Sequence, residues 1–208
     1  MTPPNRTTGI ERQAVMKAVC VYCGSSSGDD PRFVAAAREV GRRLAASERT
    51  TVFGGGRVGL MGALADAALE AGGEVIGVIP QNLMEAEVGH TGLTKLHVVE
   101  SMHERKALMA DLSDGFLTLP GGIGTMEEFF ETWTWGQLGL HAKPYGLLNI
   151  EGFYDPLIQL IDGMVARRFL KAEQASALHV GEDAGELLDR MAAYRVEPMP
   201  KWLDQPGA

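Results

Sequence analysis

Short apolar runs alternate with longer segments of helical periodicity along most of the chain. The apolar runs, many of them β-branched, predict strands at 19–23, 51–53, 75–79, 96–99, 116–119 and 145–150, with a weaker candidate at 177–180. Between them, apolar residues recur at helical spacing in 31–47, 60–69, 101–112, 125–138, 155–167 and 182–194. Residues 81–94 contain several acidic positions and are expected to form a loop.

Strands made of continuous apolar residues, each followed by a helix, are typical of a parallel sheet that is covered on both faces. The chain shows no internal repeat and no linker. We therefore predict an α/β fold: a single doubly wound, Rossmann-like parallel sheet with helices on both faces, in one domain over residues 15–195. Residues 1–14 and 196–208 are expected to be flexible tails.

Composition indicates a globular protein with an acidic surface. Of the 208 residues, 45% are hydrophobic and 22% are charged, which suffices for one core and excludes a wholly disordered chain. The formal net charge of −8 argues against a general nucleic-acid binder. No apolar run reaches the roughly 18 residues of a membrane helix. The first residues have no apolar stretch typical of a secretory signal, so we expect a cytoplasmic protein with no membrane partner.

The two cysteines, Cys20 and Cys23, form a Cys-x-x-Cys motif. Redox pairs with this spacing lie at a helix N-terminus, where the helix dipole lowers the pKa of the thiol. Residues 17–23 instead have the pattern of a strand, in which residues three apart point to opposite faces. The sequence therefore predicts two reduced and mostly buried thiols, which fits a cytoplasmic protein.

Glycine is abundant, with 26 residues, and it gathers where predicted strands end. Glycine-rich turns follow strands at 24–27, 54–59 and 120–125. In a doubly wound sheet, ligands bind at the carboxyl ends of the strands, near the topological switch point. We expect the three turns to converge on one edge of the sheet and to form a binding site there.

The middle turn, Gly54-x-Gly56-x-x-Gly59, has the spacing of a dinucleotide fingerprint. A dinucleotide site also needs an acidic residue at the end of the next strand, where Pro80 and Gln81 stand. Glu74 lies at the opposite end of that strand. A dinucleotide cofactor is therefore disfavoured. The glycines then serve either a phosphate-binding helix N-terminus or close packing of helix against strand.

The turn at 120–128, Pro-Gly-Gly-Ile-Gly-Thr-Met-Glu-Glu, is a sharper signal. Its glycines leave backbone N–H groups uncovered, and the dipole of the following helix adds positive charge, which suits one phosphate group. A triphosphate is disfavoured because no Gly-Lys-Ser/Thr motif is present. Spacing leaves two interpretations of Glu128 open: a capping-box partner of Thr125, or a catalytic carboxylate beside the phosphate.

Other candidate chemistry is limited. Arg105 and Lys106 are adjacent cations that form either a solvated helix face or, at the carboxyl edge, an anion-binding pair. The five histidines show no metal-binding spacing and no Gly-x-Ser-x-Gly elbow occurs, so we expect neither a metal site nor a serine hydrolase. Trp133 and Trp135 lie on different faces of one helix, and core packing is the favoured role of each.

Five motifs occur in a characteristic order: Cys23-Gly-Ser-Ser26, Gly54-Gly-Gly-x-x-Gly-Leu-Met-Gly62, Met102-x-x-Arg-Lys106, Pro120-Gly-Gly-x-Gly-Thr-x-x-Glu128 and Thr134-Trp-x-Gln-Leu-Gly139. Together they resemble the LOG ("lonely guy") family over about residues 17–194. Members of that family are cytokinin riboside 5′-monophosphate phosphoribohydrolases, long mislabelled lysine decarboxylases. The resemblance implies hydrolysis of the N-glycosidic bond of an N6-modified adenosine 5′-monophosphate, which releases a free base (a cytokinin) and ribose 5-phosphate.

The resemblance also implies which residues act. Arg105 and Glu128 match the catalytic pair of the family. The positions that match its nucleotide contacts are Glu87, Arg105, Lys106, Gly122, Ile123, Gly124, Thr125, Met126, Glu127, Glu128 and Thr134. The resemblance implies no cofactor, no metal, and a homodimer or higher homo-oligomer. The apolar residues 138–140 and the tryptophan-bearing helix are candidates for the interface. Arg168 and Phe169 stand where many members have Gly-Phe, which we expect to affect only a turn.

Physical chemistry agrees with this assignment, because glycosidic cleavage passes through an oxocarbenium-like state that a fixed carboxylate stabilises. Two alternatives stay open. One is a non-catalytic nucleotide or cofactor carrier of the molybdenum-cofactor-carrier type, which has no need of the Arg105–Glu128 pair. The other is a broader AMP nucleosidase. Lysine decarboxylation is disfavoured because it needs pyridoxal phosphate on a Schiff-base lysine, for which the sequence offers no clear candidate.

Overall fold

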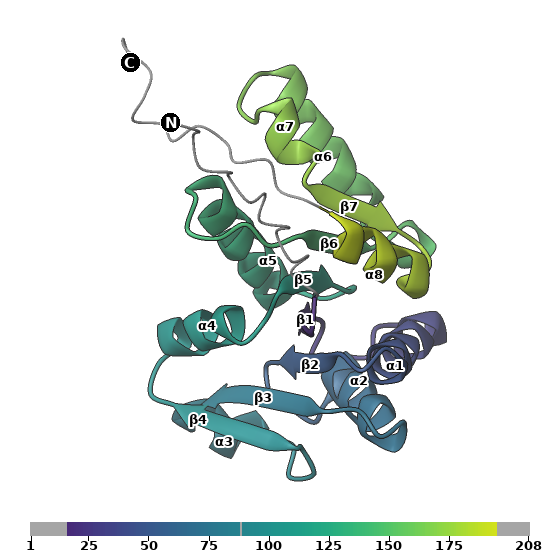
Figure 1. Ribbon diagram of the computed structural model, residues 1–208, viewed down its shortest axis with the longest axis vertical. Coiled ribbons are helices and arrows are strands. Elements are labelled where there is room, and N and C mark those ends of the chain that lie inside the picture. Colours follow the sequence, from purple (N-terminus) through teal and green to yellow (C-terminus); the bar gives the residue numbers. More distant parts are fainter. Residues whose placement is uncertain (1–15, 88, 195–208) are drawn as a thin grey trace, which may run out of the picture.

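Seven parallel strands form one sheet in the order β4-β3-β2-β1-β5-β6-β7 in the computed structural model, which describes residues 16–87 and 89–194 (Figure 1). The strands are β1 (Ala18–Tyr22), β2 (Thr50–Phe53), β3 (Val75–Pro80), β4 (Lys95–Val99), β5 (Gly115–Thr118), β6 (Tyr145–Leu148) and β7 (Leu178–Gly181). The chain adds β2, β3 and β4 on one side of β1, and then crosses over to add β5, β6 and β7 on the other. The topological switch point therefore lies between β1 and β5, and the predicted doubly wound fold is confirmed.

Helices cover both faces of this sheet. They are α1 (Pro31–Ala46), α2 (Gly59–Glu70), α3 (Gln81–Glu87), α4 (Met102–Asp111), α5 (Ile123–Gln137), α6 (Asp155–Ala166), α7 (Ala172–Ala175) and α8 (Ala184–Ala193), with a short 3₁₀ turn at Ile150–Gly152. Apolar side chains of α1, α2 and α8 form one core cluster, and those of α4, α5 and α6 form the other. Figure 1 shows α1 and α2 on the right of the sheet and α4 and α5 on its left.

Strand β1 supplies both cores, because successive side chains of a strand point to opposite faces. Val19 and Val21 belong to the cluster under α1 and α2, whereas Cys20 belongs to the cluster under α4 and α5. Cys23, just beyond the strand, faces the first cluster. Both cysteines are buried free thiols, which confirms the prediction made from their spacing.

The segment at 81–94, which was expected to be a loop, contains helix α3 at Gln81–Glu87. This expectation was wrong because it gave weight to the acidic residues. Leu, Met, Ala and Glu are all good helix formers, and no glycine or proline interrupts the seven residues. Helix α7 was also missed, since four residues are too few to show periodicity.

Some sequence-based expectations fall outside the described residues. The predicted flexible tails at 1–14 and 196–208 are among these, as are the side chains of residues 85–87. Within the described ranges, no helix combines the length and the apolar content needed to cross a membrane.

Candidate active site

The three glycine-rich turns meet at the carboxyl edge of the sheet, as expected. The N–H of Gly24 donates to the carbonyl oxygen of Pro120 at 3.1 Å, and the N–H of Leu60 donates to that of Gly24 at 3.0 Å. A Cβ on Gly59, whose φ is +59°, would lie 2.4 Å from the carbonyl carbon of Ser25. The turns after β1, β2 and β5 thus form one contiguous rim at the switch point.

Close packing explains the middle turn. A Cβ on Gly54 would lie 1.9 Å from the Nη2 atom of Arg105, so no larger residue fits while the guanidinium is in place. Glu74 precedes β3, at the opposite edge of the sheet, where it accepts a hydrogen bond from the Thr50 hydroxyl at 2.8 Å. This arrangement favours the packing interpretation of the glycines over a dinucleotide fingerprint.

The N-terminus of α5 presents uncovered backbone amides. The helix begins at Ile123, and its N-cap, Gly122, provides no side-chain cap. The first hydrogen bond of the helix runs from the N–H of Met126 to the carbonyl oxygen of Gly122, at 3.1 Å. The amides of the first turn therefore have no partner inside the helix. Ile123 is 91% exposed, and a Cβ on Gly122 or Gly124 would meet nothing within 4 Å. This open helix end suits an anionic group.

The capping-box interpretation of Glu128 is wrong. Because α5 starts two residues earlier than the sequence suggests, Thr125 is its third residue rather than its N-cap. The Glu128 side chain turns inward, and its Oε1 atom lies 3.2 Å from the Nη1 atom of Arg105. Glu128 thus pairs with Arg105 and does not cap α5.

Arg105 lies in the interior and not on a solvated helix face. Its Nε donates to the carbonyl oxygen of Val78 at 3.1 Å, and its Nη2 donates to that of Gly54 at 3.3 Å. The residue is 9% exposed. One guanidinium therefore contacts the carbonyl groups of Gly54, just after β2, and of Val78 in β3, together with the carboxylate of Glu128 on α5.

The carboxyl group of Glu128 has an unusual proton affinity. Burial raises its pKa to about 7, against the opposing effect of the positive charge of Arg105. Both protonation states are therefore populated near neutral pH. Its side chain keeps 11% of its surface accessible, so a ligand at the rim can reach it.

Lys106 is also buried, and two carboxylates of α5 hold it. Its Nζ atom lies 2.5 Å from Glu127 and 2.8 Å from Glu131. Burial alone lowers the pKa of this ammonium group, but the hydrogen bonds to the two carboxylates outweigh burial and raise it. Sequence reasoning missed Glu131, although its spacing of four from Glu127 places both on one side of the helix.

Comparisons with known proteins show which proteins this chain resembles. A family model described as "Possible lysine decarboxylase" matches residues 61–191. A cytokinin riboside 5′-monophosphate phosphoribohydrolase of Rhodococcoides fascians is 46% identical over 181 residues, which cover 86% of this chain and 91% of that protein. The protein of that name called LOG in Oryza sativa subsp. japonica is 43% identical over 184 residues, covering 88% and 76%. The chain belongs to the LOG family.

Solved structures share the fold of this LOG-family chain. The molybdenum cofactor carrier protein of Chlamydomonas reinhardtii has a TM-score of 0.65 at 20% identity, covering 86% of this chain and 99% of that one. The molybdenum cofactor binding protein of Rippkaea orientalis has a TM-score of 0.65 at 18% identity, covering 86% and 96%. At such identities the likeness concerns the fold alone, and it supports a Rossmann-like α/β architecture.

The structure brings together most, but not all, of the residues that the LOG resemblance implied. Arg105, Lys106 and the segment from Gly122 to Glu128 lie together at the rim. Thr134 is exposed, about 9 Å further along α5 than Glu128, and its hydroxyl donates to the carbonyl oxygen of Phe130 at 2.7 Å. Glu87 ends α3, and its side chain is outside the described residues.

The residues present do not fit the cofactor that the words "lysine decarboxylase" imply. A Schiff-base lysine must lose its proton readily, through a lowered pKa. Among the described lysines, Lys106 is the one at the rim. Its two carboxylate partners raise its pKa, so it keeps its proton. Lys143, whose pKa is lowered by burial, precedes β6 at the other edge of the sheet. Among the side chains that the structure describes, no grouping of three metal-ligating residues occurs.

Proposed function

We propose that this chain is a cytokinin riboside 5′-monophosphate phosphoribohydrolase. It hydrolyses the N-glycosidic bond of N6-modified adenosine 5′-monophosphate to a free base and ribose 5-phosphate. The observation that carries the proposal is the buried Arg105–Glu128 pair beside the open N-terminus of α5. Relatives of that name, 43–46% identical over 86–88% of this chain, support it.

The 5′-phosphate binds at the N-terminus of α5. The amides of Ile123, Gly124 and Thr125 point along the helix axis toward the anion, and the helix dipole adds about half a positive charge there. The exposed glycines on either side let a phosphate approach the backbone closely. Binding energy gained at the phosphate, remote from the bond that breaks, fixes the ribose in place.

Glu128 acts at the anomeric carbon. As the C1′–N9 bond breaks, its electron pair leaves with the base and positive charge develops on the ribose ring. The carboxylate stabilises that charge and accepts a proton from the attacking water, whose oxygen bonds to C1′. The base takes up one proton from solvent and Glu128 returns its proton to solvent, so one water is consumed and the products are the neutral base and ribose 5-phosphate.

Arg105 holds Glu128 in position. Two of its nitrogen atoms donate to the backbone carbonyl groups of Val78 and Gly54, which hold the guanidinium in place. The third nitrogen pairs with Glu128 and favours its ionised form. Lys106, with Glu127 and Glu131, forms a second ionic link between α4 and α5 next to the first.

An assay for released base tests the proposal. The purified chain is incubated with N6-isopentenyl-AMP, with AMP and with N6-isopentenyladenosine, and free base is measured by chromatography. We expect release from the isopentenyl nucleotide and far less from the nucleoside, which lacks the phosphate. Dialysis against a chelator is expected to leave the rate unchanged. Absence of base in all three reactions overturns the proposal, and equal rates on AMP indicate a broader nucleosidase.

A Glu128→Gln variant distinguishes an enzyme from a non-catalytic carrier. The amide keeps the shape of the side chain but cannot ionise, so we expect the rate to fall by roughly 10²–10⁴-fold while nucleotide binding persists. Circular dichroism checks that the variant is folded. Undiminished turnover in this variant rules out the catalytic role. Binding without any turnover in the unmodified chain indicates a carrier.

Two further parts of the proposal concern the whole protein. We propose that it is a homodimer, and the exposed apolar side chains of Leu138 and Leu140, which keep 64% and 71% of their surface accessible, support an interface next to α5. We also propose a cytoplasmic location. The free thiols of Cys20 and Cys23 support it, because reduced cysteines are typical of that compartment.

A further inference from the structure

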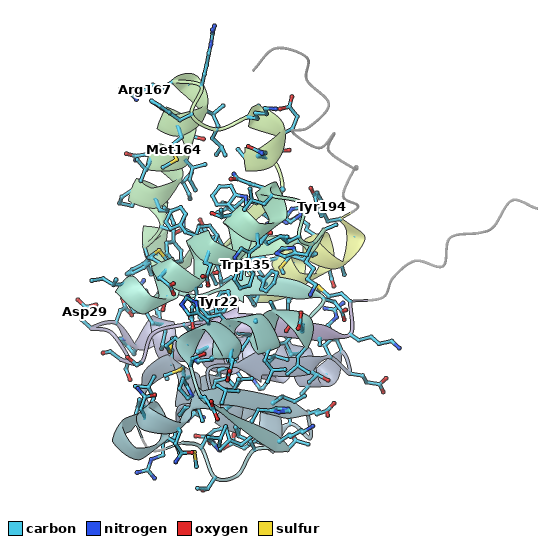
Figure 2. The ribbon with its side chains drawn as sticks, turned by 90° about the vertical axis from the view of Figure 1, so that its left-hand side faces the viewer. Tyr22, Asp29, Trp135, Met164, Arg167 and Tyr194 are labelled. Atoms are coloured by element: carbon cyan, nitrogen blue, oxygen red, sulfur yellow. The ribbon has the colours of Figure 1, made fainter. Side chains whose placement is uncertain are left out.

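The segment between α3 and β4 is held against the glycine turn that follows β2. Gly89 forms an isolated antiparallel bridge with Gly56, and the N–H of His90 donates to the carbonyl oxygen of Gly55 at 3.0 Å. Both segments lie at the half of the sheet formed by β2, β3 and β4, which is below Tyr22, the last residue of β1, in Figure 2. The segment before β4 therefore packs against the rim.

The imidazole of His90 also joins this segment to α2. Its Nε2 atom lies 2.9 Å from the Oδ1 atom of Asp66, and its Nδ1 atom accepts a hydrogen bond from the N–H of Gly92 at 3.1 Å. Because Nδ1 accepts, the ring proton is on Nε2, which donates to the carboxylate. The side chain of His90 is 12% exposed, and that of Asp66 is 52% exposed. A nearly buried imidazole thus links the segment to an exposed carboxylate on α2.

The Gly54–Gly56 turn that His90 contacts also orients Arg105. The Nη2 atom of Arg105 donates to the carbonyl oxygen of Gly54 at 3.3 Å, and its Nη1 atom lies 3.2 Å from the carboxylate of Glu128. The guanidinium packs against Gly54 where a side chain would otherwise stand. A displacement of this turn therefore moves a carbonyl group that holds Arg105 beside Glu128.

We propose that His90 is a positioning residue that, through the Gly54–Gly56 turn, fixes the guanidinium of Arg105 beside Glu128. Asp66 contributes to this role from α2, although its side chain is exposed. Loops with few such contacts open at little cost in free energy, and a shift of about 1 Å at a reacting group can lower a rate by roughly 10²-fold. The inference rests on the function proposed above and assigns a further residue to the same site.

Two substitutions of His90 separate the hydrogen bonds of its ring. The amide nitrogen of glutamine can replace Nε2 and donate to Asp66, whereas the amide oxygen of asparagine can replace Nδ1 and accept from Gly92. We expect His90→Asn to lower kcat for N6-isopentenyl-AMP by about tenfold with little change in KM, because the phosphate site on α5 is untouched. We expect His90→Gln to retain most of the activity. Full activity of His90→Asn, or an equal loss in both variants, overturns the inference.

Asp66→Ala tests the same hydrogen bond from α2. We expect it to lower kcat about as much as His90→Asn, and the two substitutions together to lower kcat no further, because both remove one interaction. Glu70→Ala is the matched control, since it removes an exposed carboxylate one helical turn further along α2. This control is expected to leave kcat unchanged. Equal kcat values in Asp66→Ala and Glu70→Ala contradict the role of the hydrogen bond.

A second measurement does not depend on turnover. Burial raises the pKa of Glu128 and Arg105 lowers it, so a guanidinium that is held less firmly leaves this pKa higher. In protein labelled with ¹³C at glutamate side-chain carboxyl groups, the resonance missing in Glu128→Gln reports the titration of Glu128. We expect its midpoint to rise by about half a pH unit in His90→Asn and to stay unchanged in Glu70→Ala.

This titration separates the possible roles of His90. A purely structural role predicts a lower thermal midpoint in His90→Asn without any change in the titration of Glu128. Superimposable titrations of His90→Asn and the unmodified chain therefore overturn the inference. If the unmodified chain releases no base, the proposed function fails, and the titration still reports whether His90 positions Arg105 beside Glu128.

Discussion

At Glu128, burial and charge act in opposite directions on one carboxyl group. Burial favours the protonated form, and Arg105 favours the ionised form. The balance sets a pKa of about 7, so a modest change in the surroundings moves the group from mostly neutral to mostly charged.

The proposed role of Glu128 predicts how catalysis depends on pH. In the proposed mechanism the ionised carboxylate is the active form, and its pKa is about 7, so kcat/KM is expected to level off above pH 7. Below it, the protonated fraction grows and kcat/KM is expected to fall by roughly tenfold per pH unit. Initial rates of base release between pH 5 and pH 9 measure the profile. A flat profile across this range would contradict the role of Glu128.

The backbone conformation of Arg168 is expected to reduce the stability of the protein. It follows the end of α6 with a φ of +63°, the left-handed conformation in which glycine is favoured. We expect Arg168→Gly to stabilise the protein by about 1 kcal/mol, measured as the free energy of unfolding in urea. Arg167→Gly is the control, because Arg167 has a φ of −91°, and it is expected to destabilise. A loss of stability in Arg168→Gly would show that the side chain makes a contact that outweighs the strain.

At the scale of elements, the inner strands β1, β3, β5 and β6 were predictable because nearly all their residues are buried and their sequences are mostly apolar. The edge strands β4 and β7 are partly exposed and gave a weaker pattern. The first residues of the helices were harder to predict. The start of α5 at Ile123 was misplaced by two residues because its N-cap is Gly122, which carries no side-chain signal. The burial of Arg105 was not visible either, since it depends on the carbonyl groups of β2 and β3, which are distant in sequence.

The open end of α5 gives an element-scale prediction. Ile123→Asp introduces a negative charge at the first helical position, on a side chain that is 91% exposed. The charge interacts favourably with the helix dipole, by roughly 0.3–1 kcal/mol, and repels a phosphate at the same amides. We expect an unchanged or higher thermal midpoint and a KM for the nucleotide raised by about tenfold, with kcat preserved. Ile123→Asn controls for size, and an equal KM in both variants would contradict phosphate binding at this helix end.

At the scale of the whole molecule, the strand order determines where chemistry is possible. Strands β1 and β5 are neighbours although some 90 residues separate them in the chain, so turns that are remote in sequence share one rim. The resemblance to the LOG family indicated the same residues without this geometry. Thr134 lies on an exposed face of α5 and the side chain of Glu87 is outside the described residues, so the roles of these two residues stay predictions.

The proposed homodimer gives a whole-molecule prediction. Replacing Leu138 and Leu140 together by glutamine removes apolar side chains that are mostly exposed in the single chain. We expect sedimentation velocity to show a dimer for the unmodified chain and a monomer for the double variant. Val98→Gln, on β4 at the other end of the sheet and 45% exposed, is expected to remain dimeric. Equal sedimentation of all three proteins would contradict this interface.

The opposite orientation of Cys20 and Cys23 has a practical consequence. Each thiol belongs to a different helical layer, and each is buried with a pKa raised by burial, so neither reacts with an alkylating reagent until its own layer opens. Two variants that retain one cysteine each therefore make separate reporters of local opening. Their relative alkylation rates would reveal whether the helices on the two sides of the sheet loosen together or one before the other.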